Sequence, residues 1–323
     1  MKKSLIAIAV IAAAGAASAQ SNVTLYGVAD VWVGKTKNGD AEMGSGGLAA
    51  SRLGFIGTED LGGGLKAHFN FEQTISLDNG AASGFDRQAN VGFSGGFGTV
   101  KLGRSFTALD DIHGAANSAF DSALAATGTV WVGYTSSANS QIYYASPEVS
   151  GLSGAVGFTL SGDQAKTAPA TATNDITSLH LKYNNGPVFA GFAYQNEKQI
   201  VGASVKHMLL NATYDLGMAT AKASFRTVKN PVGDIFINPK ATEYHLGLDY
   251  PVNSNLTLSA GFAKSDTEAS NGVRTGKSRR SVGYDFAAGY SLSKRTTMYG
   301  GLNVTRTNGV RDNFVAAGVN HTF

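Results

Sequence analysis

The stretch GLKAHFNFE, residues 64–72, alternates between apolar and polar side chains along most of its length. In an extended chain, one face would carry only apolar side chains: Leu65, Ala67, Phe69 and Phe71. The other face would carry only polar ones: Lys66, His68, Asn70 and Glu72. A period of two is that of a β-strand, whose successive side chains point to opposite faces. Residues 64–72 therefore predict a strand with one apolar face and one polar face.

The same alternation recurs in residues 219–226 and 297–305, and helical periodicity is absent from these windows. Short separators such as 61–63 and 184–186 alternate with long polar ones. The long separators are 34–50, 161–174, 229–240 and 265–280. Tight turns at one end of the strands and long loops at the other are typical of an outer-membrane barrel.

The pattern predicts sixteen strands and an all-β fold, a transmembrane antiparallel β-barrel. The expected strands are 23–33, 51–60, 64–76, 87–94, 98–105, 139–145, 153–161, 175–184, 187–196, 203–214, 218–228, 240–250, 255–264, 281–291, 295–305 and 313–323. The alternative, a soluble β-sandwich, would hide one face of each strand in a second sheet. A sandwich does not explain the alternation of turn lengths.

Both ends of the chain support export to a membrane. Lys2 and Lys3 precede an uncharged apolar stretch, and Ala17-Ser18-Ala19 is a cleavage site of small residues, so residues 1–19 are expected to be a signal peptide. The barrel would then occupy residues 20–323. The chain ends in FVAAGVNHTF, residues 314–323, where period two places Phe323 on the outward face at the periplasmic aromatic girdle.

Composition excludes several other classes of protein. The net charge of +3 falls to +1 without Lys2 and Lys3, which argues against a nucleic-acid partner. There is no cysteine, so no disulfide framework stabilises the chain. Six histidines lie on separate segments without metal-ligand spacing, and no nucleophile elbow or phosphate loop occurs. No cofactor, no metal and no enzymatic activity are expected.

Several segments resemble the Gram-negative general porin family over essentially the whole mature chain. They include VTLYGVADV from Val23, SRLGFIGTEDLGGGLKAHFNFE from Ser51 and RQANVGFSGGFGTVKLGR from Arg87. The resemblance implies a trimeric outer-membrane barrel for passive diffusion of ions and small hydrophilic solutes. It also implies a third loop folded into the lumen. In this family the terminal Phe323 would be read by the outer-membrane assembly machinery.

The acidic side of a pore constriction is expected in the longest gap between strands, residues 106–138. Connections of this length are usually functional or disordered, and its place matches the inward-folded third loop of the family. We interpret Asp110, Asp111 and Asp121 as one wall of the constriction. Ordinary solvated loop carboxylates are the alternative.

The basic wall would come from the strands. Alternation turns Arg52, Lys66 and Lys101 toward the lumen, and the resemblance places Arg52 in the constriction cluster. The family also tends to have a pore arginine at the position of Arg87, although strict alternation points Arg87 outward. Arg104 has outward parity as well and is expected to make trimer contacts.

The strand pattern leaves several alternative functions open. A substrate-specific channel, a barrel-borne hydrolase and a nonporous structural barrel share the same strand pattern. Some family members carry a further arginine where this chain has Ser136-Ser137-Ala138, so anion selectivity is in question. The basic run GKSRR, residues 276–280, is either a solvated loop or a contact to lipopolysaccharide. The expected partners are a homotrimer, outer-membrane lipid and lipopolysaccharide, the assembly machinery and permeating solutes.

Overall fold

The computed structural model describes residues 22–160, 173–199, 203–231, 237–270 and 275–323. The predicted signal peptide, residues 1–19, lies outside these ranges. So do most of the predicted long separator 161–174 and parts of the separators 229–240 and 265–280.

The described residues form seventeen strands and four short helical turns. The strands are β1 (Asn22–Thr36), β2 (Ala41–Ser45), β3 (Arg52–Gly62), β4 (Leu65–Thr74), β5 (Gln88–Gly95), β6 (Gly98–Phe106), β7 (Ser137–Ala145), β8 (Leu152–Thr159), β9 (Thr173–Asn185), β10 (Val188–Gln199), β11 (Val205–Asp215), β12 (Thr220–Lys229), β13 (Ile237–Pro251), β14 (Leu256–Ser270), β15 (Thr275–Ser291), β16 (Thr296–Thr307) and β17 (Val310–Thr322). The helical turns are α2 (Asp110–His113), η1 (Gly114–Ala116), η2 (Ala119–Asp121) and α3 (Ala126–Val130).

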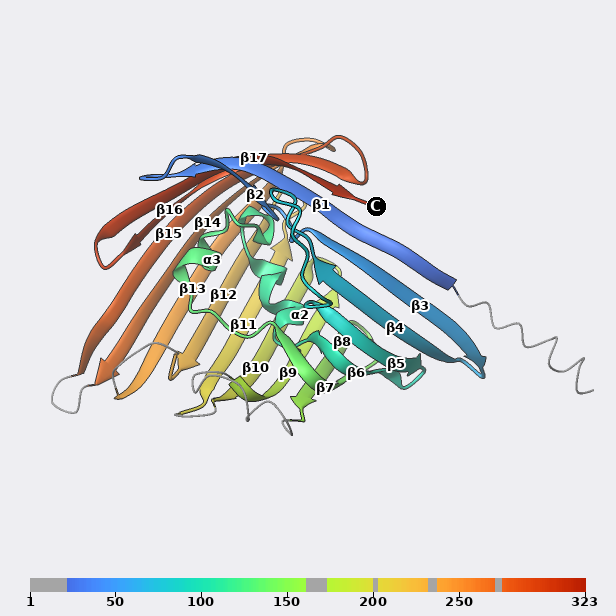
Figure 1. Cartoon of the computed structure of the whole chain (residues 1–323). Helices are drawn as coiled ribbons and strands as arrows, with labels where there is room; N and C mark the ends of the chain where they lie inside the picture. The colour runs from blue at the N-terminus through green and yellow to red at the C-terminus, as the bar shows by residue number, and fades with distance from the viewer. Residues whose placement is uncertain (1–21, 161–172, 200–202, 232–236, 271–274) are drawn as a thin grey trace, which may run out of the picture.

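The strands close into a ring because β1 pairs on both sides. Val28 of β1 is opposite Arg52 of β3 and also opposite Thr322 of β17. The short β2 pairs with β1 outside this circuit, so sixteen of the seventeen described strands make up the barrel, all antiparallel (Figure 1). The predicted sixteen-stranded antiparallel barrel is confirmed.

Burial in this barrel is reversed relative to a soluble protein. On β13, Leu246 is 61% exposed, whereas its inward-facing neighbour His245 is 1% exposed. Outward apolar side chains are stable when the surrounding solvent is hydrocarbon. Inward polar side chains line the lumen or contact the segment that fills part of it. Within the described ranges, no helix is long and apolar enough to cross a membrane.

The strands extend beyond the apolar band, which corrects two predicted loops. β14 continues to Ser270 and β15 begins at Thr275, inside the predicted separator 265–280. The sequences SDTEAS, residues 265–270, and TGKSRR, residues 275–280, do not alternate between apolar and polar residues, although the backbone ladder between β14 and β15 continues there. β2 also lies within a predicted separator, 34–50.

The connection between β16 and β17 is a two-residue turn, Asn308-Gly309, at the end of the barrel where longer connections were predicted. Both residues have positive φ angles, 50° and 87°, as a type I′ hairpin requires. An Asn-Gly pair is the usual sequence for this turn. The alternation of short and long connections therefore ends before the last hairpin.

Candidate functional site

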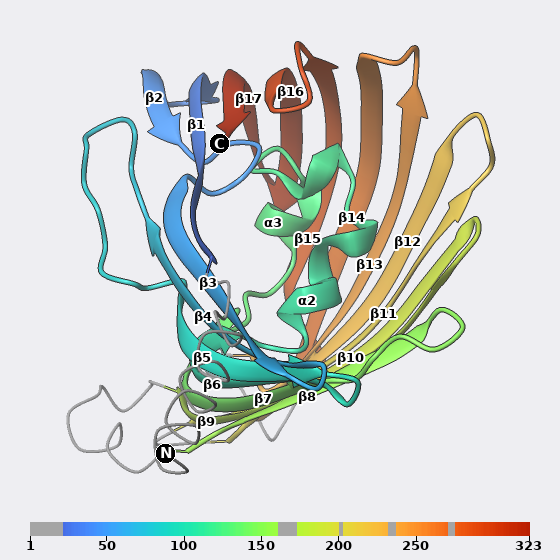
Figure 2. The same cartoon turned by 90° about the vertical axis from the view of Figure 1, so that its right-hand side faces the viewer.

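Residues 107–136, called the inner loop below, run from β6 to β7 through the inside of the barrel (Figures 1 and 2). Its apolar side chains pack against inward-facing residues of the wall. This cluster contains Leu109, Ile112, Ala126, Val130 and Trp131 from the inner loop with Ala193, Leu209 and Ala263 from the strands. The predicted inward fold of the third loop is confirmed by this packing.

Polar side chains of the wall also fix the inner loop along its length. Asp285 of β15 accepts hydrogen bonds from Ser118 Oγ and from the backbone N–H of Ala126, each at 2.7 Å. At the start of the loop, Ala108 N–H donates to Ser178 Oγ of β9 at 3.0 Å. Farther on, Asn303 of β16 donates to the carbonyl oxygen of Leu124. The inner loop is therefore attached to the wall from β9 to β16.

A fully buried ion pair forms the centre of this attachment. Arg226 of β12 and Glu243 of β13 are cross-strand partners, with Nε and Oε2 2.5 Å apart. The guanidinium lies 4.8 Å from the ring centroid of Trp131 and donates to the carbonyl oxygen of Val132. Glu243 accepts a hydrogen bond from Val132 N–H at 2.6 Å. The sequence shows Arg226 as an inward residue, but its partners in the inner loop are more than 90 positions away.

The opposite wall carries the basic side chains, arranged around Glu72 of β4. Arg87 Nε donates to Glu72 Oε1 at 2.6 Å, and Arg52 Nε lies 3.5 Å from Oε2. Tyr26 donates a further hydrogen bond to Glu72 at 2.9 Å. The guanidinium of Arg87 also lies 5.3 Å from the ring centroid of Phe106. Arg52 and Arg87 therefore share one carboxylate that was not among the residues predicted for the constriction.

The inward position of Arg87 corrects the orientation given by strict alternation. Strand β5 begins at Gln88, so Arg87 precedes the ladder, and the parity of Val91 and Phe93 does not determine the direction of its side chain. Glu72 lies directly opposite Gln88 on the neighbouring strand. The backbone N–H of Arg87 donates to the carbonyl oxygen of Glu72 at 3.2 Å, so the Arg87 side chain can reach the Glu72 carboxylate.

Asp110 and Asp111 form the first turn of helix α2 in the inner loop. Tyr134 donates to Asp110 Oδ1 at 2.7 Å, and Tyr143 of β7 donates to Asp111 Oδ2 at 2.5 Å. Burial raises the pKa of Asp110 to about 6, and the negative charges of Asp111 and Asp121 act in the same direction, whereas the Tyr134 hydrogen bond and the charge of Arg87 lower the pKa. Burial also raises the pKa of Asp111. Asp111 Oδ2 also lies 3.5 Å from His180 Nδ1 of β9, so this carboxyl contacts the wall at β7 and β9.

Asp121 lies at the end of a left-handed turn. Ala119, Phe120 and Asp121 have φ angles of 47°, 62° and 55°, a conformation that costs roughly 1–2 kcal/mol per non-glycine residue. Asn117 Nδ2 donates to Asp121 Oδ1 at 2.6 Å. A Cβ at Gly114 would lie 2.0 Å from Asp121 Oδ2, so glycine leaves the space that the carboxylate occupies. Burial raises the pKa of Asp121.

The two lysines lie at different levels of the barrel. Lys101 of β6 places Nζ 5.0 Å from the ring centroid of Tyr143, whose hydroxyl donates to Asp111. Lys66 is opposite Asp60, next to the β3–β4 turn. It is eight residues along β4 from Thr74, the cross-strand partner of Arg52, or about 26 Å at the rise of a strand. The structure therefore brings Lys101 to the acidic residues and does not bring Lys66 to the arginines.

Arg104 and Phe323 lie away from the lumen. Arg104 is at a register shift in β6 and donates to the carbonyl oxygen of Asp86 and, at 2.5 Å, to Asn139 Oδ1. Phe323 exchanges two backbone hydrogen bonds of 3.1 Å with Gly27 of β1. A Cβ at Gly27 would lie 2.4 Å from the Phe323 ring. The absence of a side chain at Gly27 therefore provides the place for the terminal aromatic ring.

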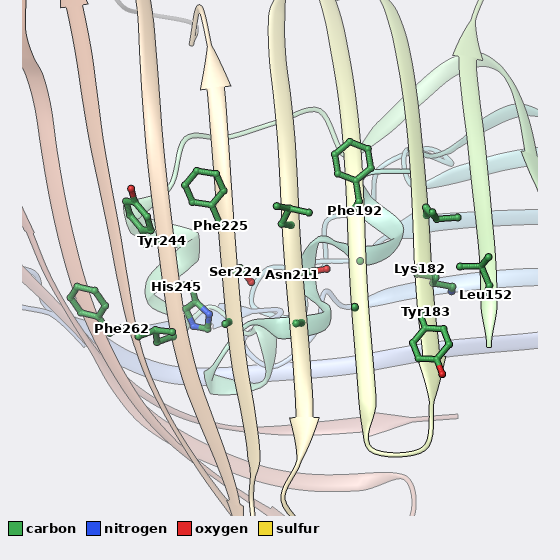
Figure 3. Close-up of a pocket in the computed structure, with 17 residues that line it drawn as sticks. Leu152, Lys182, Tyr183, Phe192, Asn211, Ser224, Phe225, Tyr244, His245 and Phe262 are labelled. Carbon is green, nitrogen blue, oxygen red and sulfur yellow. The ribbon is translucent and has the colours of Figure 1, made fainter. Parts of the chain in front are cut away.

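A separate groove of about 690 Å³ lies on the outer face of the wall. Outward side chains such as Phe192, Phe225 and Tyr244 line it, and the helices of the inner loop lie behind the strands (Figure 3). The groove is almost entirely apolar, so it belongs to the lipid-facing surface and not to the pore. Among the described residues, no group of three histidine, aspartate or glutamate side chains converges as a metal site.

Comparisons with known proteins agree with this geometry. A family model described as Gram-negative porin matches residues 5–310. Outer membrane porin protein 32 of Delftia acidovorans is 35% identical, covering 94% of this chain and 89% of its own. An outer membrane porin protein of Bordetella pertussis is 29% identical, with both chains covered completely.

Solved structures share the whole architecture. An anion-selective porin from Comamonas acidovorans superposes with a TM-score of 0.80 at 26% identity, covering 94% of this chain and 100% of that one. OmpT of Vibrio cholerae, described in a trimer form, superposes with a TM-score of 0.73 at 18% identity, covering 94% and 99%. The likeness to OmpT shows the fold alone.

Proposed function

This chain belongs to the Gram-negative porin family, and from that premise we propose which of its residues control the passage of ions. It is an outer-membrane porin, a water-filled channel for passive diffusion of ions and small hydrophilic solutes. Like its relatives it is a channel and not an enzyme. Its strands cross the outer membrane, with the polar lumen inside.

The proposed constriction lies between the inner loop and the wall of β3 to β6. Arg52 and Arg87 form its basic side, and Asp110, Asp111 and Asp121 its acidic side. The observation that carries this assignment is the Glu72 cluster: Arg87 and Arg52 lie 2.6 Å and 3.5 Å from one carboxylate. Arg87 also lies 5.3 Å from the ring centroid of Phe106, the residue directly before the inner loop. Opposed charges across a narrow lumen create a transverse field that orients dipolar solutes and biases ions.

The charges of this constriction nearly balance. Three cations, Arg52, Arg87 and Lys101, stand against Glu72 and the three aspartates of the inner loop. We therefore propose a weak cation preference at neutral pH. The Comamonas porin is described as anion-selective, and this chain would differ from it.

Single-channel recording under a salt gradient tests the assignment. We expect Arg52→Ala to move the reversal potential toward cation preference and Asp121→Ala to move it toward anion preference. Unchanged reversal potentials in both variants would place the constriction elsewhere in the channel. Loss of conductance in the folded wild type would contradict the pore itself.

We propose that the chain is exported with residues 1–19 as a cleaved signal peptide and assembles as a homotrimer. Structural neighbours include an outer membrane protein of Vibrio cholerae described in a trimer form, and conductance steps that arrive in threes would support the same state here. The trimer contact at Arg104 stays a prediction. So do recognition of Phe323 by the assembly machinery and contacts with outer-membrane lipid and lipopolysaccharide. Deletion of Phe323 should lower the fraction of the chain that is folded in the outer membrane, while the total amount of chain synthesised stays the same.

A further inference from the structure

Three arginines meet on the outer face of the barrel, beside the Asn308–Gly309 turn. Arg280 of β15, Arg306 of β16 and Arg311 of β17 line a cavity of about 630 Å³. This end of the strands is opposite the end where Phe323 lies, so it is the extracellular end. Because the three side chains lie on the outer face and at this end, they lie at the level of the outer leaflet and do not line the lumen.

The arrangement of Arg306 and Arg311 is unfavourable without an anion. They are direct cross-strand partners, and both are exposed. Like charges directly opposite each other destabilise a strand pair. Neither guanidinium forms an ion pair or hydrogen bond within the part of the chain that the structure describes. Arg280 exposes 63% of its side chain and lies 3.8 Å from Asp266 Oδ1.

The cavity is basic at the rim and apolar toward the middle of the membrane. Val282 lies opposite Arg306, and the next outward pair along the same two strands is Tyr284 and Val304. All three apolar side chains line the cavity with the arginines. A ligand that fits this surface has an anionic head at the level of the arginines and a hydrocarbon chain beside Tyr284 and Val304.

We propose that this cavity binds the phosphorylated headgroup of an outer-leaflet lipid of the lipopolysaccharide class. Guanidinium groups bind phosphate oxygens in a bidentate manner, and a phosphate between Arg306 and Arg311 neutralises their repulsion. The acyl chains continue over Val304 and Tyr284. The proposal rests on outer-membrane residence of the chain but not on the assignment of the pore constriction.

The order of charge and apolar surface favours a lipid over a protein partner. The cations lie only at the rim, and the apolar residues follow in the direction in which acyl chains extend into a bilayer. Free phosphate would use the arginines but would gain nothing from Tyr284. A second copy of the chain would need a carboxylate cluster at the same height on its own outer face.

The test uses the folded full-length barrel in detergent and native mass spectrometry to count bound lipid. The probes are lipid A with two phosphates, its monophosphorylated form and phosphatidylethanolamine, with inorganic phosphate as competitor. The variant is Arg306→Gln with Arg311→Gln, and the matched control is Arg295→Gln, an exposed arginine in the turn between β15 and β16.

We expect the wild type and Arg295→Gln to bind lipid A equally and the double variant to bind on the order of tenfold or more weakly, since charged hydrogen bonds are lost. In lipid-free detergent the double variant should unfold at the same temperature as wild type or higher, because the repulsion is gone. Adding lipid A should raise the unfolding temperature of the wild type more than that of the double variant. A merely structural role for the two arginines would give the opposite order in lipid-free detergent.

Equal lipid binding by the double variant and the wild type would overturn the proposal. If inorganic phosphate competes as effectively as lipid A, the bound phosphate need not belong to a lipid, and the lipid part of the proposal is overturned. Dissociation of the oligomer in the double variant, seen on native gels, would overturn it in favour of a subunit contact. Single-channel conductance should stay at the wild-type value, so failure of this site is distinguishable from failure of the pore.

Discussion

Glu72 accepts a 2.6 Å hydrogen bond from Arg87 and exposes only 5% of its side chain. Its second oxygen lies 3.5 Å from Arg52. One carboxylate therefore neutralises part of the charge of two guanidinium groups and holds them in the same stretch of wall. The effective charge of this wall is closer to one positive unit than to two.

Replacing Glu72 by glutamine should shift the channel toward anions. The substitution keeps the shape of the side chain and leaves both arginines uncompensated. Two unit charges 4 Å apart in water interact by about 1 kcal/mol, so we expect the anion-to-cation permeability ratio to rise roughly two- to fivefold. The reversal potential in a gradient around 0.1 M salt measures this ratio, since higher salt screens the effect.

The matched control is Glu59→Gln, which removes an exposed carboxylate near the periplasmic end of β3. This variant should leave the reversal potential within the scatter of the wild type. An equal shift in both variants would mean that total charge of the channel sets selectivity, and not the Glu72 cluster.

Selectivity should also depend on pH through Asp110. Burial raises the pKa of this carboxyl to about 6, so it is ionised at pH 7.5 and about nine-tenths protonated at pH 5. Acidification removes a negative charge from the inner loop. We expect cation preference to decrease between pH 7.5 and pH 5, with a midpoint near pH 6, in recordings of reversal potential.

Two substitutions separate Asp110 from other titrating groups. Asp110→Asn should flatten the transition near pH 6, whereas Asp78→Asn, in an exposed outer segment, should keep it. Tyr134→Phe removes the hydrogen bond that lowers the pKa of Asp110, so the midpoint should move to higher pH. A midpoint that stays in place in Tyr134→Phe would assign the transition to another group.

Arg226 should be essential for holding the inner loop in place. Arg226→Met leaves Glu243 buried without its cation, which typically costs about 3–5 kcal/mol. We expect a lower unfolding temperature and larger current noise, because Val132 loses one of its attachments to the wall. On the refolded protein, loss of heat-modifiable mobility on gels measures the unfolding temperature, and single-channel recording measures the current noise.

A second substitution tests the cause of that loss. Glu243→Gln in the Arg226→Met background removes the buried charge while one oxygen can still accept from Val132 N–H. The double variant should therefore recover part of the unfolding temperature. A double variant less stable than Arg226→Met would show that the remaining carboxylate is not the source of the damage.

Much of this architecture could be predicted from the period of the sequence. Alternation in stretches such as 64–72 identifies lipid-facing and lumen-facing residues, because the two solvents of a barrel wall differ so strongly. The length of the segment 106–138 marked the inner loop. Both features are local, so a single chain reveals them.

The arrangement of the constriction could not be predicted in the same way. Parity gives the face of a residue but not its height along the barrel, so Lys66 and Arg52 looked equivalent although they lie at different levels. Parity also fails at strand ends, as Arg87 shows. The role of Glu72 depends on two neighbours 15 and 20 residues away, and a period of two contains no information about such contacts.

Asp30 of β1 should determine how firmly the barrel closes. Its buried carboxylate accepts hydrogen bonds from Tyr299 Oη at 2.6 Å and Asn320 Nδ2 at 2.7 Å, on the closing strands. It also accepts three backbone N–H groups, those of Gly47, Leu48 and Ala49. Five donors converge on one carboxylate, so an amide at this position must turn its own N–H₂ toward donors.

Asp30→Asn should therefore lower the free energy of unfolding by about 3 kcal/mol or more, since hydrogen bonds to a charged acceptor are lost. Urea titration of the barrel in lipid vesicles measures this quantity. The control is Asp40→Asn, an exposed carboxylate beyond the end of β1. The carbonyl oxygen of Gly47 accepts a hydrogen bond from Ala123 of the inner loop, so Asp30→Asn should also increase current noise. A stable barrel with increased noise would mean that Asp30 positions the inner loop without closing the ring, and unchanged values of both would contradict either role.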